Sequence, residues 1–344
     1  MSVAEPTPTL TRKDFTSDQE VRWCPGCGDY AILAAVQRLM PELGVPKEDT
    51  VFVSGIGCAA RFPYYMNTYG FHTIHGRAPA VATGMKLANP KLDIWLVSGD
   101  GDALSIGGNH LIHLVRRDVD LQFLLFNNQI YGLTKGQYSP TSVLGQRTPS
   151  SPMGSVDNAM SAAELALGAG SRFVARSVDT DLKHLPKVLT RAHQHRGTSL
   201  VEIFQNCVVF NDNAFGHFTA KDVASDRQLM LEHGEPMLFG ADNGKGLRVR
   251  PGGGVQLEVV TLGEDGIGIG DVLVHNETDR VLAGALAQLQ PPAFPVALGV
   301  LYCNPGVTTY DRAVRDQVVQ ARAKRGPGDL NRLLRSGHTW KVEL

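Results

Sequence analysis

The sequence predicts an α/β protein whose central sheet is mostly parallel and is flanked by helices. Short runs of β-branched and apolar residues alternate along the chain with segments of helical period. The strand-like "LDIWLVSGDG", the helix-like "LSIGGNHLIHLVRRD" and the strand-like "VDLQFLLFNNQIYG" follow one another within about 35 residues, which is the length of a βαβ unit with parallel strands. The 37 glycines suit a fold with many tight turns and close backbone approaches to a ligand.

Size and charge exclude several classes of protein. The chain has 344 residues, enough for one large domain or two ordinary ones, with 43% hydrophobic and 19% charged residues. The formal net charge of -1 provides no basic field for nucleic acid. We find no apolar run of the roughly 18 residues that a membrane span needs, and no secretory signal at the N-terminus. We therefore expect a cytoplasmic protein with reduced thiols and with neither nucleic acid nor a membrane as partner.

The elements before the βαβ unit can be assigned in order. We expect residues 1–15 to form a frayed or partner-bound tail. The apolar spacing of "YAILAAVQRLM" predicts a helix, and the β-branched "TVFVSGIGC" predicts a strand that ends in a glycine loop. The stretch "PAVATGMKLANP" begins with Pro and closes at Asn-Pro, which is typical of a short helix.

The elements after the βαβ unit are less regular. Residues 136–157 are rich in Ser, Pro, Gly and Thr, which indicates a long ordered loop or a mobile lid. The stretches that follow predict a helix, a strand, an amphipathic helix and a buried strand, in the order "SAAELALGAG", "RFVARSVD", "LKHLPKVLTRAHQHRG" and "TSLVEIFQNC". Beyond Asn211 we expect a hairpin at "LRVRPGGGVQLEVV", a helix at "ETDRVLAGALAQL", a strand at "FPVALGVLYCNP" and a basic, polar end. We predict one α/β domain over residues 16–220 and an extension over 221–344 packed on it.

Residues capable of chemistry follow four of the predicted strands. Cys58, Asp100, Asn128 and Cys207 each lie just past the carboxyl end of a strand. In open parallel sheets, ligands bind at that edge. We therefore expect these four residues to lie close together and to form a site.

The stretch "GDGDA" places Asp100 and Asp102 among glycines at the end of a buried strand. A lone motif of this kind is more often a tight turn in which Asp caps the next helix. Asn128 favours a metal site, because Mg²⁺ takes hard oxygen ligands from one or two protein side chains and from substrate phosphates. The carboxylate of Asp100, the amide oxygen of Asn128 and the backbone carbonyl of Ile130 would supply such ligands.

The same loop has features of a phosphate site. Gly99 and Gly101 would let the backbone approach a phosphate, and the helix predicted from about Leu104 would direct its N–H groups at it. A GDG followed about 28 residues later by Asn resembles the thiamine diphosphate motif of transketolase-like and 2-oxoacid-processing enzymes. The resemblance implies that Asp100 and Asn128 bind Mg²⁺ by side chain and Ile130 by its carbonyl. It also implies that "YGLT" at 131–134 completes the wall around the diphosphate.

The chain has five cysteines, an odd number that argues against a complete set of disulfides. Cys24 and Cys27 form a C-x-x-C, which fits zinc, a redox dithiol or half of an iron–sulfur site. The dithiol needs a preceding strand, which the sequence lacks. The spacing of the thiols leaves zinc and an iron–sulfur cluster equally favoured. Cys58 would be a third ligand, and either Cys207 or Cys303 the fourth, because both follow a buried strand; a free Cys is also commonly just a buried small hydrophobe.

Six stretches in order resemble one family over about residues 15–220. They are "WCPGCG", "GIGCAARFPYY", "HGRAPAVATGMKLANP", "GDGDALSIGGNH", "FNNQIYGLTKGQYSPTS" and "VEIFQNC". Together they resemble the β subunit of the 2-oxoacid:ferredoxin oxidoreductases, and "LTKGQ" resembles the 2-oxoglutarate branch. The resemblance implies a thiamine-diphosphate-binding α/β domain and a 4Fe-4S cluster held by Cys24, Cys27, Cys58 and Cys207. Cys303 has no counterpart in that set.

The resemblance also implies the reaction. Such enzymes use thiamine diphosphate to decarboxylate a 2-oxoacid, pass the electrons through the cluster to ferredoxin, and transfer the acyl group to coenzyme A. For 2-oxoglutarate the products are succinyl-CoA and CO₂, and the reverse direction fixes CO₂, as in the reverse tricarboxylic acid cycle. We expect the thiamine diphosphate to contact residues on four loops, namely Ile56, Gly57, Cys58, His75, Gly99, Gly101, Asp102, Gly132, Leu133 and Thr134.

Three residues are candidates for contacting substrate. Arg61 lies three residues beyond Cys58, and Lys135 follows the diphosphate wall. Arg suits a two-pronged grip on a carboxylate, and Lys a point charge, although exposed cations of this kind are usually surface residues. The two carboxylates of 2-oxoglutarate would justify two cations, whereas pyruvate, with one carboxylate, would need only one. His75 would contact the cofactor or transfer a proton, and otherwise makes a structural hydrogen bond; Asp102 would contact the diphosphate or only cap a helix.

One part of a thiamine enzyme is missing from the sequence. Activation of thiamine diphosphate needs a Glu beside its aminopyrimidine ring, and in the family this Glu lies on the α subunit. We therefore expect the chain to act only in an αβ complex, with an α₂β₂ assembly. Three alternatives remain: the same chemistry on pyruvate or another 2-oxoacid, a thiamine enzyme without a cluster, and a zinc-stapled scaffold subunit that only supports a partner.

Overall fold

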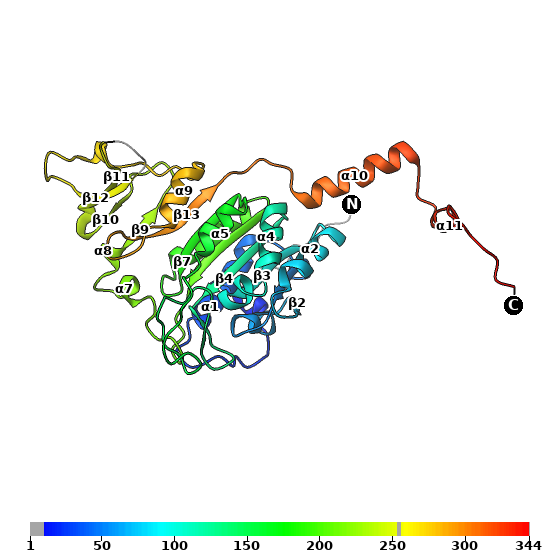
Figure 1. The fold of residues 1–344 in the computed structure, drawn as a ribbon, viewed down its shortest axis with the longest axis horizontal. Helices are drawn as coiled ribbons and strands as arrows, with labels where there is room; N and C mark the ends of the chain where they lie inside the picture. The colour runs from blue at the N-terminus through cyan, green and yellow to red at the C-terminus, as the bar shows by residue number, and fades with distance from the viewer. Residues whose placement is uncertain (1–9, 253–255, 344) are drawn as a thin grey trace, which may run out of the picture.

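An eight-stranded sheet forms the centre of the computed structural model, which describes residues 10–252 and 256–343 (Figure 1). Its strand order is β2-β1-β3-β4-β8-β7-β13-β9. The strands are β1 Thr50–Ser54, β2 Tyr69–His72, β3 Asp93–Gly99, β4 Leu121–Asn127, β7 Phe173–Val178, β8 Thr198–Phe204, β9 Gln228–Leu231 and β13 Val296–Cys303. The strands from β2 to β7 in this order are parallel, and β13 pairs antiparallel with β7 and parallel with β9. The predicted α/β class with a mostly parallel sheet is confirmed.

Helices cover both faces because successive residues of the strands point to opposite sides. Val51 and Val53 pack in one apolar cluster with α2, α4, α5 and α9, whereas Phe52 packs in the other with α1 and α6. The helices are α1 Asp29–Leu43, α2 Ala78–Ala88, α4 Gly108–Arg117, α5 Ala162–Gly168, α6 His184–Gln194 and α9 Arg280–Ala287. No helix in the described parts of the chain has both the length and the apolar character to traverse a bilayer.

Two expectations at the start of the chain and in the βαβ unit need correction. Of the tail predicted over residues 1–15, residues 1–9 lie outside the described structure. Residues 12–15 form the short helix η1 Arg12–Phe15 and are anchored to the body, because the Phe15 side chain is fully buried. The single helix predicted from about Leu104 is interrupted. The short α3 Asp100–Leu104 begins directly after β3, and Ser105 leaves helical geometry before α4 begins. The interruption brings the backbone of Gly107 against Gly76. A Cβ on Gly76 would lie only 2.6 Å from the Gly107 nitrogen, so this position requires glycine.

The extension is joined to the main sheet through β9 and β13. Between them lies a three-stranded antiparallel sheet of β10 Leu238–Phe239, β11 Lys245–Val249 and β12 Leu257–Thr261, flanked by α8 Ala224–Arg227. The predicted hairpin is confirmed in the pairing of β11 with β12, although residues 253–255 of its turn lie outside the described structure. After β13 the chain continues into α10 Tyr310–Arg325 and α11 Leu330–Leu334, which extend away from the body (Figure 1).

Candidate active site

Four neighbouring strands deliver the predicted residues to one edge of the sheet. Asp100 and Asn128 directly follow β3 and β4, and Cys58 and Cys207 lie on the loops after β1 and β8. Since β1, β3, β4 and β8 are adjacent and parallel, their carboxyl ends meet. A cavity of about 120 Å³ opens there, lined by Ile56, Gly57, Cys58, Ala59, His75, Gly99, Asp100, Gly101, Asp102, Asn128, Ile130, Tyr131, Gly132, Leu133 and Thr134.

Asp100 is a buried carboxylate in the wall of this cavity, 1% exposed. The hydroxyls of Ser139 and Thr141 donate to its Oδ2 at 2.6 and 2.5 Å, and they come from the loop after β6 Gln137–Tyr138. Burial raises the pKa of this carboxyl, because the charged form has lost its water. A buried carboxylate held in one orientation by hydroxyls is a suitable ligand for a hard cation, which would offset the loss of hydration.

Asn128 is held by its own loop and by Gln205, the residue that directly follows β8. Its Oδ1 accepts a hydrogen bond from the Ile130 N–H at 3.2 Å, and its Nδ2 donates to Gln205 Oε1 at 2.8 Å. Gln129, between Asn128 and Ile130, has a left-handed backbone with φ of 56°. An amide oxygen has two lone pairs, so Oδ1 keeps one for a further partner.

Of the two roles expected for Asp102, the helix cap is wrong, while contact with the diphosphate stays a prediction because Asp102 lines the cavity. Although it lies in the short α3, it neither caps the following helix α4 nor keeps its oxygens free. Its Oδ1 accepts from the N–H groups of Ile56 at 3.1 Å and Gly76 at 2.7 Å and contacts His75 Nδ1 at 2.5 Å, while Ser98 donates to Oδ2 at 2.6 Å. One buried carboxylate therefore joins the loops after β1 and β2 to the end of β3.

The thiols of Cys27, Cys58 and Cys207 lie near one another, and those of Cys58 and Cys207 lie beside the cavity. A Cβ placed on Gly132 would lie 3.5 Å from Cys207 Sγ and 3.6 Å from Cys58 Sγ. Burial, with the nearby charge of Asp29, raises the pKa of Cys58 to about 12 and that of Cys27 further. Within the described ranges, no group of three or more His, Cys, Asp or Glu is arranged to hold a single metal ion.

The remaining two cysteines differ in position. Cys24 is exposed, and its carbonyl accepts the Cys27 N–H at 3.0 Å in the C-x-x-C turn. Cys303 ends β13, which runs opposite to β7, so it pairs with Phe173 at the start of that strand. It therefore lies at the amino edge of the parallel strands, away from the other cysteines, and is not a fourth ligand with them.

Two residues at this edge were missed by sequence reasoning. Gln205 donates from Nε2 to Cys27 Sγ at 3.2 Å and accepts from Asn128, so one side chain contacts both candidate sites. Asp29 is buried, and among the described residues neither of its oxygens accepts a hydrogen bond of ordinary length and angle. Burial raises its pKa to about 7, although the nearby Cys27 thiol acts in the opposite direction. Their positions beside "CPGCG" and "FQNC" are the only sequence signal that points to either.

The three candidate substrate residues occupy different surroundings. His75 lines the cavity. Arg61 lies near Cys58, and its Nε donates to the Tyr65 hydroxyl at 3.1 Å. Lys135 is exposed, with a left-handed φ of 83° in the turn after Thr134. Neither Arg61 nor Lys135 is part of the cavity lining.

Comparison with known proteins gives consistent matches. The family model of the thiamine pyrophosphate enzyme C-terminal, TPP-binding domain matches residues 55–203. The 2-oxoglutarate oxidoreductase subunit KorB of Mycobacterium tuberculosis is 51% identical over 335 residues, which cover 96% of this chain and 88% of that protein. The 2-oxoacid:ferredoxin oxidoreductase 1 subunit beta of Aeropyrum pernix is 46% identical over 55% of this chain, and the match spans 60% of that protein.

A solved structure matches the whole fold. It is a 2-oxoglutarate:ferredoxin oxidoreductase from Magnetococcus marinus with 2-oxoglutarate, coenzyme A and succinyl-CoA bound. The TM-score is 0.74 with 31% identity, and the match covers 96% of this chain and 97% of the other.

Proposed function

Since this chain belongs to the family of 2-oxoacid:ferredoxin oxidoreductase β subunits, we propose that it is the β subunit of an enzyme that oxidises 2-oxoglutarate with coenzyme A and ferredoxin. The observation that carries this proposal is that Asp100 and Asn128 lie at the same edge of the sheet as Cys58 and Cys207. The Mycobacterium and Archaeoglobus relatives are named for 2-oxoglutarate, and the Magnetococcus enzyme holds 2-oxoglutarate and succinyl-CoA. The products would be succinyl-CoA and CO₂, in a reversible reaction.

Thiamine diphosphate and Mg²⁺ would occupy the cavity between β1, β3 and β4. Asp100 and Asn128 would bind Mg²⁺ through their side-chain oxygens, and Ile130 through its carbonyl. The buried Asp100 supports this, because a cation would stabilise the charge that burial disfavours. The cofactor would supply the nucleophilic carbon that reacts with the keto group. Gly99 and Gly101 would face the diphosphate, and Asp102 would hold the loops bearing Ile56 and His75 in place.

A 4Fe-4S cluster held by Cys24, Cys27, Cys58 and Cys207 would lie beside this cavity. In such a cluster each cysteine binds a different iron, so the thiols need not surround one point as they would for a single zinc ion. Burial disfavours the thiolate forms of Cys27 and Cys58, and bound iron would stabilise them. Gln205 would orient Cys27 by donating to its sulfur.

The site needs a second chain. Small-molecule pockets typically measure about 300–1,000 Å³, whereas the cavity here is about 120 Å³. The names of the relatives as β subunits imply an α partner. We propose that the α subunit closes the cavity and supplies the activating Glu, and that two such αβ units assemble.

The substrate carboxylates would be held by cations near the cavity. Arg61 and Lys135 would bind the two carboxylates of 2-oxoglutarate, and His75 would hold or move a proton through Nε2 while its Nδ1 stays on Asp102. Pyruvate, with one carboxylate, is the alternative substrate.

The experiment uses the αβ complex purified without oxygen. We expect visible absorbance of an iron–sulfur cluster, and faster reduction of a low-potential dye with 2-oxoglutarate than with pyruvate. Colourless protein with a full complement of zinc would contradict the cluster. Asp100→Ala should abolish Mg²⁺-dependent binding of thiamine diphosphate and leave the iron content unchanged; unchanged cofactor binding in this variant would contradict the assignment of Mg²⁺.

A further inference from the structure

Residues 310–343, here called the arm, project from the body (Figure 1). At its base the Asp120 N–H donates to Asp311 at 3.3 Å, and the guanidinium of Arg117 lies 5.5 Å from the ring of Tyr310. Asp120 immediately precedes β4, so the arm leaves the body at the amino edge of the sheet, opposite the candidate active site. Every residue from 315 to 343 is exposed.

The arm carries apolar side chains that the described body does not cover. Val318 and Val319 of α10 are 45% and 59% exposed, and Leu333, Leu334 and Trp340 are 68%, 70% and 84% exposed. A helix of 16 residues such as α10 is marginal in water unless an apolar face packs against something. Large exposed apolar residues gathered in one segment mark an interaction surface.

The charges of the arm and of one part of the body are opposite. The arm has eight Lys and Arg against four Asp and Glu. Residues 222–279, here called the acidic unit, contain β9 to β12 and have eleven Asp and Glu against four Lys and Arg. The acidic unit also exposes apolar residues, including Ile269 at 59% and Val274 at 51%. In Figure 1 it lies at the end of the molecule away from the arm of the same chain.

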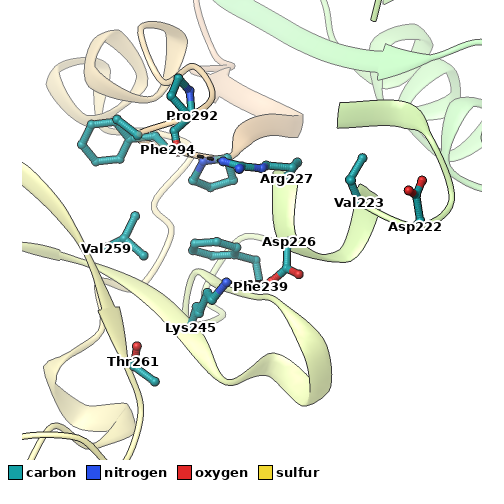
Figure 2. Close-up of a pocket in the computed structure, with 12 residues that line it drawn as sticks. Asp222, Val223, Asp226, Arg227, Phe239, Lys245, Val259, Thr261, Pro292 and Phe294 are labelled. Carbon is teal, nitrogen blue, oxygen red and sulfur yellow. Dashed lines mark hydrogen bonds and ion pairs between the residues drawn. The ribbon is translucent and has the colours of Figure 1, made fainter. Parts of the chain in front are cut away.

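A cavity of about 310 Å³ at the border of the acidic unit could receive an apolar side chain (Figure 2). Phe239, Val259 and Phe294 line it, with Asp222 and Asp226 beside them. The cations in its wall already have partners: Arg227 donates to the Pro292 carbonyl at 2.7 Å, and Lys245 pairs with Asp226 at 2.8 Å.

We propose that the arm docks on the acidic unit of a second copy of this chain, with its basic residues against the acids and its apolar residues at the cavity. A two-fold axis would make the contact reciprocal, so each body would receive the arm of the other. The α subunit is a less suitable occupant, because it would close the active site at the carboxyl edge of the sheet, whereas the arm leaves at the amino edge. The proposal depends on charge and exposure in this chain and needs no bound cofactor.

The test uses αβ complexes in which two copies of the chain carry different tags. We expect the untruncated complex to yield both tags in one purification, and removal of residues 310–344 to abolish this and to halve the molar mass in solution. The double change Arg322→Glu and Arg325→Glu should reduce recovery of the second tag by about tenfold, which corresponds to about 1.4 kcal/mol. The double change Glu235→Lys and Glu264→Lys should do the same.

The decisive comparison is a variant that carries both double changes, so that the charges of the arm and of the acidic unit are exchanged. If the arm contacts the acidic unit of a second copy, the exchanged charges attract again and recovery of the second tag returns. The control Glu42→Lys and Glu48→Lys changes two exposed acids outside the acidic unit and should leave recovery unchanged. Unchanged mass after truncation would overturn the proposal. So would failure of the combined variant to recover, because the arm would then contact another surface, such as the α subunit.

Discussion

Gly101 and Gly99 of the GDG loop provide a matched pair of substitutions. A Cβ on Gly101 would overlap the ring of Tyr131, with Cδ1 and Cζ both at 2.7 Å, whereas a Cβ on Gly99 would meet only the Phe126 carbonyl at 4.0 Å. The Tyr131 ring cannot move freely, because its hydroxyl donates to the Gly101 carbonyl at 3.0 Å. Overpacking of this kind destabilises a protein by about 1–3 kcal/mol, and loss of the hydrogen bond adds about 1 kcal/mol.

We therefore expect Gly101→Ala to lower the free energy of unfolding of the chain without added Mg²⁺ or thiamine diphosphate by about 2–4 kcal/mol. Gly99→Ala should leave that stability within about 0.5 kcal/mol of the parent, because nothing crowds its methyl group. Chemical denaturation of each variant, followed by circular dichroism, measures both values. Equal stability of the two variants would refute the reasoning that Tyr131 is fixed against Gly101.

Three further results are expected. Gln205→Leu should weaken Mg²⁺-dependent binding of thiamine diphosphate and also shift the reduction potential of the proposed cluster, because Gln205 contacts both Asn128 and Cys27. Titration calorimetry and a redox titration check this, and a change in only one of the two quantities would count against the shared contact. Burial lowers the pKa of His195 to about 4, so the unfolded chain binds an extra proton between this value and about 6.5, and stability falls as the pH drops. Between pH 7 and pH 5 this residue should account for about 2 kcal/mol of the lost stability, and denaturation of His195→Gln should show a flatter pH dependence than the parent. Since Cys58 and Cys207 are proposed ligands of the cluster, removing iron with a chelator under reducing conditions should expose their thiols to alkylation, as followed by mass spectrometry. The buried Cys303 should stay unmodified.

The sequence was sufficient to predict the edge at which the site lies. Cys58, Asp100, Asn128 and Cys207 could be grouped because each follows a buried strand, and parallel strands place such positions at a common edge. The βαβ pattern around Asp100 supplied the direction of the two central strands. The pairing of Asp100 with Asn128 depends on residues within about 35 positions of one another, the length of one such unit. Cys58 and Cys207 lie farther away in the sequence, and each was placed by the local pattern of its own strand.

The contacts that orient the site residues could not be predicted in the same way. Ser139 and Thr141 reach Asp100 from a loop whose path depends on tertiary packing, and no local pattern indicates it. The spacing of the thiols left Cys207 and Cys303 open, and only the resemblance favoured Cys207. The physical reason is the direction of β13, because an antiparallel strand ends at the opposite edge. β2 was missed since its residues are exposed at the edge of the sheet and show no buried pattern.

The position of β13 has a consequence for how the protein folds during its synthesis on the ribosome. β13 covers the outer edge of β7, but more than a hundred residues separate the two strands in the chain. Until residue 303 has been synthesised, β7 presents unpaired N–H and C=O groups along that edge. An open strand edge is a template for pairing with other chains. The nascent protein should therefore be most prone to aggregation late in translation, and chains that stop before β13 should be recovered mainly as insoluble material.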